Sequence, residues 1–404
     1  MRLRKAGYNR KELKLDFDNH PLSDWLQEIR RDFHMHPELG HKEFRTTEKI
    51  KEILLGLGIH IQDLPALETG AAGIFPEQSE GKTIALRGDI DALPMTQRND
   101  VPYKSIYDGV MHSCGHDCHA TIILGVAKTL ADSDKWKQLK GNVKFILQPA
   151  EETIAGAMSM IDAGVLQNPT IDRIIGVHMN VDLPAGHVGL YKGVSNAGAD
   201  TFRLEIHGKG VHGAFPHEGI DPIVAGAHFV TGVQSIVGRN IDPLDSAVIT
   251  VGQFQSGTAP NIIPDRAVLT GTVRTFKKEV RQLIIQRLES IATGLEKTFQ
   301  VDVDYRFTDG VPICITNETV TEDLYTAAVN VLGEDKVHYA TAQMGGEDFG
   351  QFMDRVPGTF MRIGCRNEEK GIIHKGHSPY FDVDETALAV GVEVLTEAVR
   401  SYLK

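Results

Sequence analysis

The chain of 404 residues has only four cysteines, too few for the disulfide framework of a small secreted protein. It also lacks an excess of positive charge, because 54 aspartates and glutamates face 42 lysines and arginines, which gives a net charge of −12. Nucleic acids and anionic membranes select basic surfaces, so neither is expected as a partner. Residues 1–20 are basic at their start but contain no apolar run, and predict neither a signal peptide nor a membrane anchor. These absences predict a cytoplasmic protein with reduced cysteines.

Two thiols and three imidazoles are concentrated in one segment, MHSCGHDCH at residues 111–119. Thiolate and neutral imidazole are favoured ligands of borderline-soft divalent ions, so this segment predicts a metal site. Cys114 and His116 would point away from each other on a helix, whereas a loop can turn both toward one ion. We therefore expect a loop that leads into a helix from about His119, with Asp117 as its cap.

Other interpretations of the cluster are weaker. A haem-attachment motif requires CxxCH, but three residues separate Cys114 from Cys118. A closed structural zinc site requires a second pair of ligands at short spacing, and the remaining cysteines, Cys314 and Cys365, stand alone. Buried structural thiols stay an alternative, because one cluster does not exclude them.

The first half of the chain alternates between helical and strand patterns. Residues 22–57 predict a pair of helices. Three short apolar runs then predict buried strands, at residues 83–86, 143–147 and 173–177, with helical segments between them. Such alternation indicates an α/β domain with a mainly parallel sheet.

Polar side chains follow each predicted strand. They are Asp89 and Asp91 after the first, Glu151 and Glu152 after the second, and His178 after the third. Ligands of open α/β sheets gather beyond the carboxyl ends of the strands, so we expect these groups to meet Cys114 and His116 there. If Glu151 and Glu152 lie on extended backbone, they point to opposite sides, and one can bind metal while the other acts as a base.

A different pattern begins at about Ala197. Its strands and helices follow a β-α-β-β-α-β order, the signature of a split βαβ, ferredoxin-like α+β domain. We expect residues 197–311 to form this domain, inserted into a catalytic domain of residues 1–196 and 312–404. An inserted domain of this kind can serve as a lid or as a dimerisation surface. The length and the apolar content of 41% fit two or three domains with separate cores.

Nine motifs occur in the order found in a known family of enzymes. They are RGDIDALP, MHSCGHD, QPAEE, GVH, GKGVHGAFPH, NIIPD, GTVRT, GGEDF and HSPYF. Over roughly residues 25–395 the chain thus resembles the N-acyl-amino-acid amidohydrolases, which include the indole-acetyl-amino-acid hydrolases and hippurate hydrolases. They are a branch of the aminoacylase and carboxypeptidase metalloenzymes, metallopeptidase family twenty. The motif set is specific for the family, not for a substrate.

The resemblance implies a dinuclear metal site and assigns roles to individual residues. The implied metal ligands are Cys114, His116, Glu152, His178 and His377. Glu151 is implied as the general base and acid, and Asp91 as a residue that orients the site. His212, from the lid of a partner subunit, is implied to stabilise the oxyanion, and Asn261 and Arg274 to meet the substrate carboxylate. For Arg274 a structural salt bridge is an equal alternative. The ligand types admit zinc, manganese, cobalt or nickel.

The chain departs from the family pattern at a few positions. Val211 stands where a glycine usually precedes the histidine, and Cys118, where small or aliphatic residues are usual, is interpreted as non-ligating. His374 competes with His377 for the last ligand position, and His377 is preferred because it directly precedes a Ser-Pro turn. His217 is either a supporting group or a turn residue.

The expected activity is hydrolysis of an amide between an acyl group and an amino acid or short peptide, by a homodimer or higher homo-oligomer. A metal-activated water attacks the carbonyl, and Glu151 transfers the proton to the leaving nitrogen. Alternatives are a carboxypeptidase, a dipeptidase or an N-acetyl-amino-acid deacetylase on the same scaffold. A non-catalytic metal-binding relative is opposed by the presence of both glutamates and of every expected ligand.

Overall fold

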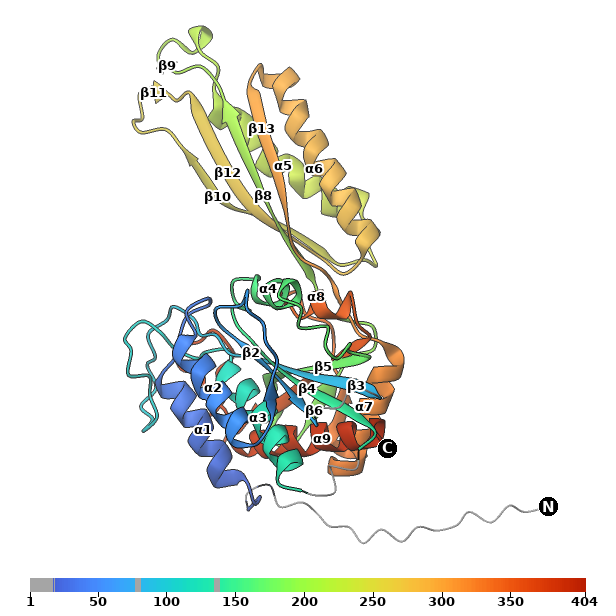
Figure 1. The fold of residues 1–404 in the computed structure, drawn as a ribbon. Coiled ribbons are helices and arrows are strands. Elements are labelled where there is room, and N and C mark those ends of the chain that lie inside the picture. Colours follow the sequence, from blue (N-terminus) through green and yellow to red (C-terminus); the bar gives the residue numbers. More distant parts are fainter. Residues whose placement is uncertain (1–16, 18, 77–80, 134–138) are drawn as a thin grey trace, which may run out of the picture.

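The computed structural model describes residues 17, 19–76, 81–133 and 139–404. Most of the start of the chain, for which neither a signal peptide nor an anchor is predicted, lies outside the described residues. Figure 1 shows a body built around a large sheet and an elongated part that extends from it, built around a smaller sheet. Among the described helices, none is long and apolar enough to cross a bilayer.

The large sheet has eight strands in the order β1-β2-β4-β3-β5-β16-β6-β15. Its centre, from β4 to β16, is parallel, which confirms the predicted α/β class and mainly parallel sheet. Antiparallel pairs involve β1 and β2 at one edge and β6 on the other side, so the sheet is mixed outside its centre. The strands are β1 (His60–Ile61), β2 (Ala71–Phe75), β3 (Lys82–Asp89), β4 (Gly141–Gln148), β5 (Arg173–Pro184), β6 (Val188–Leu190), β15 (Val337–Tyr339) and β16 (Gly358–Arg366).

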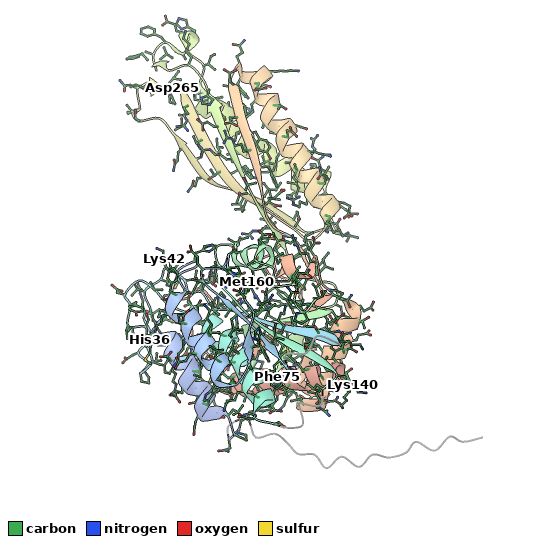
Figure 2. All side chains as sticks on the ribbon, viewed as in Figure 1. His36, Lys42, Phe75, Lys140, Met160 and Asp265 are labelled. Carbon is green, nitrogen blue, oxygen red and sulfur yellow. The ribbon has the colours of Figure 1, made fainter. Side chains whose placement is uncertain are left out.

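Helices cover both faces of this sheet, and its central strands are buried on both sides. On β3, Leu86 packs in one core and Ala85 in the other, as expected for side chains that alternate along a strand. The larger core lies under α1 (Ser23–Met35), α2 (Phe44–Gly56), α3 (His116–Ala131), α7 (Glu318–Leu332) and α9 (Thr386–Tyr402). The smaller core lies under α4 (Gly156–Asp162) and α8 (Gly350–Met353). Met160 of α4, labelled in Figure 2, is fully buried in this smaller core.

The smaller sheet has four antiparallel strands in the order β10-β12-β8-β13. It follows the β-α-β-β-α-β order, with β8 (Gly198–His207), α5 (Pro222–Asn240), β10 (Ala247–Ser256), β12 (Arg266–Thr275), α6 (Lys278–Phe299) and β13 (Asp302–Val311). Alternate residues of β12 are buried, and Phe229 and Leu288 of the two helices pack in the same core. Beyond the far end of this sheet lie the short strands β9 (Val211–His212) and β11 (Ile262–Ile263), with Asp265 close by (Figures 1 and 2).

The chain leaves the body and returns to it at one place. Strand β7 (Val194–Asn196), just before the smaller sheet, pairs with β14 (Cys314–Ile315), just after it. This pairing joins the two crossing segments at the base of the elongated part, as an insertion in a surface loop requires.

Two local expectations were wrong. Asp117 does not cap helix α3, which begins within the metal segment. The N-cap residue is Gly115, and no side chain caps the helix. The Asp117 carboxylate accepts hydrogen bonds from Arg30 (2.9 Å) and the His34 ring (2.7 Å) instead. His178 does not follow its strand but lies within β5, which continues to Pro184.

Candidate metal centre and catalytic site

A sharp turn separates Cys114 from His116. Gly115 has φ +90°, and a Cβ there would approach the Met179 side chain to 3.0 Å, so glycine suits both the conformation and the space. Cys114 therefore lies on the loop and His116 begins α3. Cys118, on the same helix, is completely buried in the large core, and burial raises the pKa of its thiol well above the usual value.

The carboxylates lie beyond the ends of the two neighbouring strands, as expected. Asp89 ends β3, and Asp91 follows two residues later. Glu151 and Glu152 follow β4, but the expectation of extended backbone there was wrong. Residues 151–154 form a turn, and Ala150 before them has φ +52°. The turn, rather than the alternation of a strand, sets the directions of the two glutamates.

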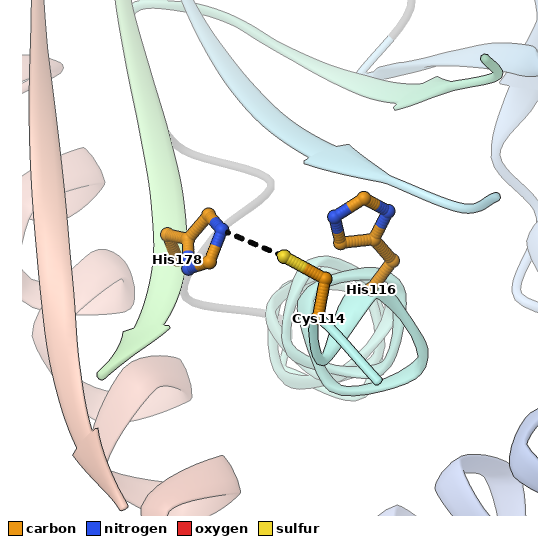
Figure 3. Close-up of side chains that lie close together, drawn as sticks. All are labelled: Cys114, His116 and His178. Atoms are coloured by element: carbon orange, nitrogen blue, oxygen red, sulfur yellow. Dashed lines mark hydrogen bonds between the residues drawn. The ribbon is translucent and has the colours of Figure 1, made fainter. Parts of the chain in front are cut away.

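Five side chains supply the ligand atoms of one cluster. Cys114 Sγ lies 3.4 Å from His178 Nε2, and His116 completes a group whose ligand atoms lie within 4.8 Å of one another (Figure 3). A second group of the same size consists of Cys114, Glu152 and His377, with His377 Nε2 3.2 Å from Glu152 Oε1. The two groups share Cys114, so the five predicted ligands surround one small volume.

Hydrogen bonds orient the two imidazoles on the sheet side of this cluster. His116 Nδ1 lies 3.0 Å from Asp91 Oδ1, and His178 Nδ1 lies 2.7 Å from the Met179 carbonyl oxygen. Since a carbonyl can only accept, Nδ1 of His178 carries the proton and its Nε2 has a free lone pair. Asp91 also accepts the backbone N–H of Glu152 at 2.9 Å. One carboxylate thus holds both His116 and the Glu152 backbone, an arrangement typical of metal sites.

Among the described residues, two buried ligand atoms of the cluster, His116 Nε2 and Glu152 Oε1, form no well-aligned hydrogen bond, although His377 Nε2 lies 3.2 Å from Glu152 Oε1. Buried polar atoms without a partner are rare and costly, and these two face each other at 3.9 Å. Their donor types, one imidazole nitrogen and one carboxylate oxygen, suit a divalent cation. The residues present therefore fit a metal site.

His119 lies beside the cluster but has both ring nitrogens engaged. Its Nε2 accepts the Met179 backbone N–H at 2.7 Å, which leaves the proton on Nδ1, directed at Asp89. Burial lowers the pKa of His119, so the neutral ring is favoured. His119 supports the backbone next to His178 and is not available as a ligand.

Glu151 faces the cluster from a more enclosed position. It forms one possible ligand group with His116 and Glu152, and another with Glu347 and Asp348 of the GGEDF segment. Burial raises the pKa of Glu151 well above its usual value, and the nearby carboxylates of Glu347 and Asp348 raise it further. A carboxyl group whose pKa is raised above its usual value can both accept and return a proton.

Arg87 holds the acidic groups behind Glu151 together. Its fully buried guanidinium lies 2.9 Å from Asp89, 3.0 Å from Asp348 and 3.2 Å from Glu347. Burial raises the pKa of Asp348 to about 7, although Arg87 opposes this shift. The GGEDF motif, a weak signal in the sequence, is thereby fixed against Asp89 and Glu151.

Of the two candidate histidines near the C-terminus, the structure brings His377 to the cluster. Its backbone N–H donates to the Ser113 carbonyl at 2.8 Å, which joins the two ligand loops. His374 is exposed and packs beside Tyr380, with ring centroids 5.4 Å apart.

The residues predicted from the lid do not come together within one chain. His212 and Asn261 lie at the far tip, where β9 pairs with β11 and the Gly213 N–H donates to the Asn261 carbonyl. Arg274 lies near the opposite end of β12, where a Cβ on Gly346 would be 2.8 Å from its Nη1. At about 3.3 Å per residue, the strand separates the two ends by roughly 26 Å. His217, also at the tip, is exposed.

Three residues near the site escaped the sequence analysis. Arg30 of α1 is fully buried and bonds to Asp117 next to His116. Glu43 accepts the Ala150 N–H at 2.8 Å, directly before Glu151. Arg362 lines a cavity that also contains Cys114 and His178. In the sequence alone, such an arginine or glutamate does not differ from a surface charge.

Comparisons with known proteins agree with this geometry. A family model described as peptidase family M20/M25/M40 matches residues 85–401. An N-acetylcysteine deacetylase of Bacillus subtilis (strain 168) is 39% identical over 372 residues, which cover 92% of this chain and 95% of the relative. Thermostable carboxypeptidase 2 of Saccharolobus solfataricus is 37% identical over 381 residues, 94% of this chain and 95% of the relative.

A solved structure shares the fold along the whole length. The YXEP protein of Bacillus subtilis, described as a dinuclear metal binding peptidase from the M20 family, gives a TM-score of 0.82 at 35% identity. The match covers 95% of this chain and 98% of that one. The names of these relatives describe hydrolases, and none describes a non-catalytic metal-binding protein.

Proposed function

Because the chain belongs to peptidase family M20/M25/M40 and is a metal-dependent amide or peptide hydrolase, we propose that it hydrolyses N-acyl amino acids to a carboxylate and a free amino acid. One observation carries the proposal, the cluster of Cys114, His116, Glu152, His178 and His377 with the buried carboxylate of Glu151 beside it. Ligands and a base at one point are what hydrolysis of a linear amide requires.

In this proposal the five clustered residues hold two divalent metal ions. Two ions agree with the description of the similar Bacillus subtilis peptidase as dinuclear. When bound, the ions supply polarisation of the scissile carbonyl and acidification of water. Asp91 keeps His116 in the tautomer that offers Nε2, through the contact at 3.0 Å.

Glu151 moves the proton. Its carboxylate removes a proton from the attacking water and returns it to the nitrogen of the departing amino acid. The position supports this role, because Glu151 is enclosed among His116, Glu347 and Asp348 and does not point to bulk solvent. Arg87 keeps the neighbouring carboxylates in place while the proton moves.

The elongated part is proposed to act as a lid and as a dimerisation surface. His212 and Asn261 lie too far from the cluster of their own chain, so we infer that they serve the site of a partner chain in a homodimer, with the carboxylate of the substrate held by Asn261 and Arg274. Edge strand β10 supports the dimer, since Val248 and Phe254 on it are 39% exposed.

Mixed dimers test this arrangement. E151Q and H212A should each be inactive alone, because each removes one half of every site. Mixed after dissociation, they should recover about a quarter of wild-type activity, because about half of the dimers are hybrids with one intact site of two. A mixture no more active than its components would contradict the shared site.

A substrate panel tests the proposed reaction. N-acetyl and aromatic N-acyl amino acids are compared with dipeptides, using enzyme reconstituted with zinc, manganese, cobalt or nickel, and chelated enzyme as the control. The proposal predicts faster hydrolysis of the N-acyl amino acids and loss of activity on chelation. A carboxypeptidase or dipeptidase is the second candidate, since the carboxypeptidase of Saccharolobus solfataricus is nearly as similar to this chain as the deacetylase is. Faster turnover of dipeptides would favour this candidate.

A further inference from the structure

Arg362 lies beside the metal cluster on strand β16. It is directly opposite His178 in the parallel pair of β16 and β5. Both residues line a cavity of about 190 Å³, together with Cys114 and His377. The cavity is therefore continuous with the proposed reaction centre, and a ligand bound there can reach Arg362.

The guanidinium of Arg362 has no carboxylate within 4 Å among the described residues, although Arg362 is only 5% exposed. Its Nε donates to the Tyr191 hydroxyl at 3.0 Å, and its Nη2 donates to Asn196 Oδ1 at 3.4 Å. Within the described chain, Nη1 has no hydrogen-bond acceptor. One face of the group packs over the Phe360 ring at 4.8 Å. These contacts fix the group in place without neutralising it.

The two other deeply buried arginines of the body are different. Arg30 and Arg87 each have three carboxylates within 4 Å. Burying a cation without a counter-charge is unfavourable, and proteins normally pair such groups. Besides Arg362, the cavity is lined by one other lysine or arginine among the described residues. This residue, Lys375, is exposed and pairs with Asp182 at 3.0 Å. Arg362 is therefore the uncompensated cation of this cavity.

We propose that Arg362 binds a carboxylate of the substrate, so that the enzyme selects amides carrying an anionic group on this side of the reaction centre. This inference deepens the proposed function and rests on it. A guanidinium offers a planar pair of N–H donors that matches a carboxylate, and a site with little water strengthens the pairing. Asn180 and Gln343 also line the cavity and supply further polar contacts.

The carboxylate can come from either side of the scissile amide. On the leaving side it is the α-carboxylate of the amino acid, which Arg362 would then hold in place of Asn261 and Arg274, and on the acyl side it is a second acid group of the acyl chain. Three probes separate these sources: N-acetyl-L-leucine, N-succinyl-L-leucinamide, and N-acetyl-L-leucinamide, which has no carboxylate. R362M removes the guanidinium at similar length, and R362K keeps a charge without the fork. R366M changes an exposed arginine of the same strand that pairs with Glu368, and serves as the control.

Binding is measured by calorimetry on the zinc-loaded full chain in the E151Q background, in which turnover does not interfere. R362M should weaken the binding of one carboxylate probe by about 10- to 100-fold, R362K should weaken it less, and N-acetyl-L-leucinamide should be unaffected. The affected probe identifies the source of the carboxylate. Less than twofold loss for both carboxylate probes, or equal loss for all three, would overturn the proposal. If R362M does not fold, R362K decides by the same criteria.

Turnover of the same probes by the wild-type enzyme is a separate readout. If no probe is hydrolysed but R362M still selectively weakens the binding of a carboxylate probe, the proposed reaction fails and the carboxylate site stands. If hydrolysis proceeds equally well with all probes and with R362M, the reaction stands and the carboxylate site fails.

Discussion

Replacing Arg30 with methionine should destabilise the body and loosen the metal site. The Arg30 guanidinium is completely buried and lies 2.9 Å from Asp117, 3.0 Å from Asp382 and 3.2 Å from Glu385. Asp117 follows the proposed ligand His116, and Asp382 follows the loop of the proposed ligand His377. A single side chain of α1 therefore joins the two segments that carry these proposed ligands.

The size of the expected loss of stability depends on the partners that each carboxylate keeps after the substitution. Glu385 retains Arg31, and Asp382 retains the Tyr103 hydroxyl at 2.8 Å. Asp117 is completely buried, and within the described part of the chain its carboxylate retains only the His34 ring. Removing one partner of a buried pair costs about 3–5 kcal/mol, and since two of the three acids stay partnered, we expect the lower end, about 3 kcal/mol.

Urea unfolding followed by circular dichroism measures this loss. R31M is the matched control, because Arg31 also pairs with Glu385 but its side chain is 39% exposed, and it should cost at most about 1 kcal/mol. R30M/D117N should recover part of the loss, since it removes the stranded charge. A free energy of unfolding for R30M within about 1 kcal/mol of the wild type would show that the buried Arg30 pairs do not stabilise the body as expected.

Three further changes test other parts of the site. C114S should weaken metal retention by at least about 10-fold, measured as metal content after dialysis against a chelator, whereas C118S, in the core, should retain it. E43A leaves the buried Ala150 N–H without its acceptor and should cost about 1–3 kcal/mol in urea unfolding, together with a lower kcat. Burial raises the pKa of Asp384, but its hydrogen bonds lower it overall, so its contribution is present at neutral pH and is lost as the pH falls below about 4. Accordingly, D384N should unfold at lower urea than the wild type at pH 7, and the difference should shrink as the pH falls below about 4; a difference that stays constant there would contradict this.

The central strands and the ligand loop could be predicted because their patterns are local. The short apolar runs of β3, β4 and β5 are buried on both sides, which is typical of the central strands of a parallel sheet. The pair of Cys114 and His116 at a spacing of two residues indicated a loop before a helix, and Gly115 provides that turn. In both cases the responsible residues are neighbours in the sequence.

Tertiary contacts explain what the sequence did not reveal. Asp117 looked like a helix cap, but a buried arginine 87 residues away binds its carboxylate more strongly than an exposed backbone N–H would. The turn at Glu151 depends on Glu43, which is 107 residues from Ala150. Arg362 follows an apolar run and gives no local sign of its missing counter-charge. Such partners are set by packing, and residue spacing does not encode them.

Glu151 is proposed to transfer the proton in metal-dependent amide hydrolysis. The most direct measurement compares kcat and bound metal for wild type and E151Q on the best substrate of the panel. E151Q should keep the wild-type metal content, because Glu151 is not among the five proposed ligands, and should lose about 10²- to 10⁴-fold in kcat. An E151Q enzyme with full metal content and near-wild-type kcat would contradict the account.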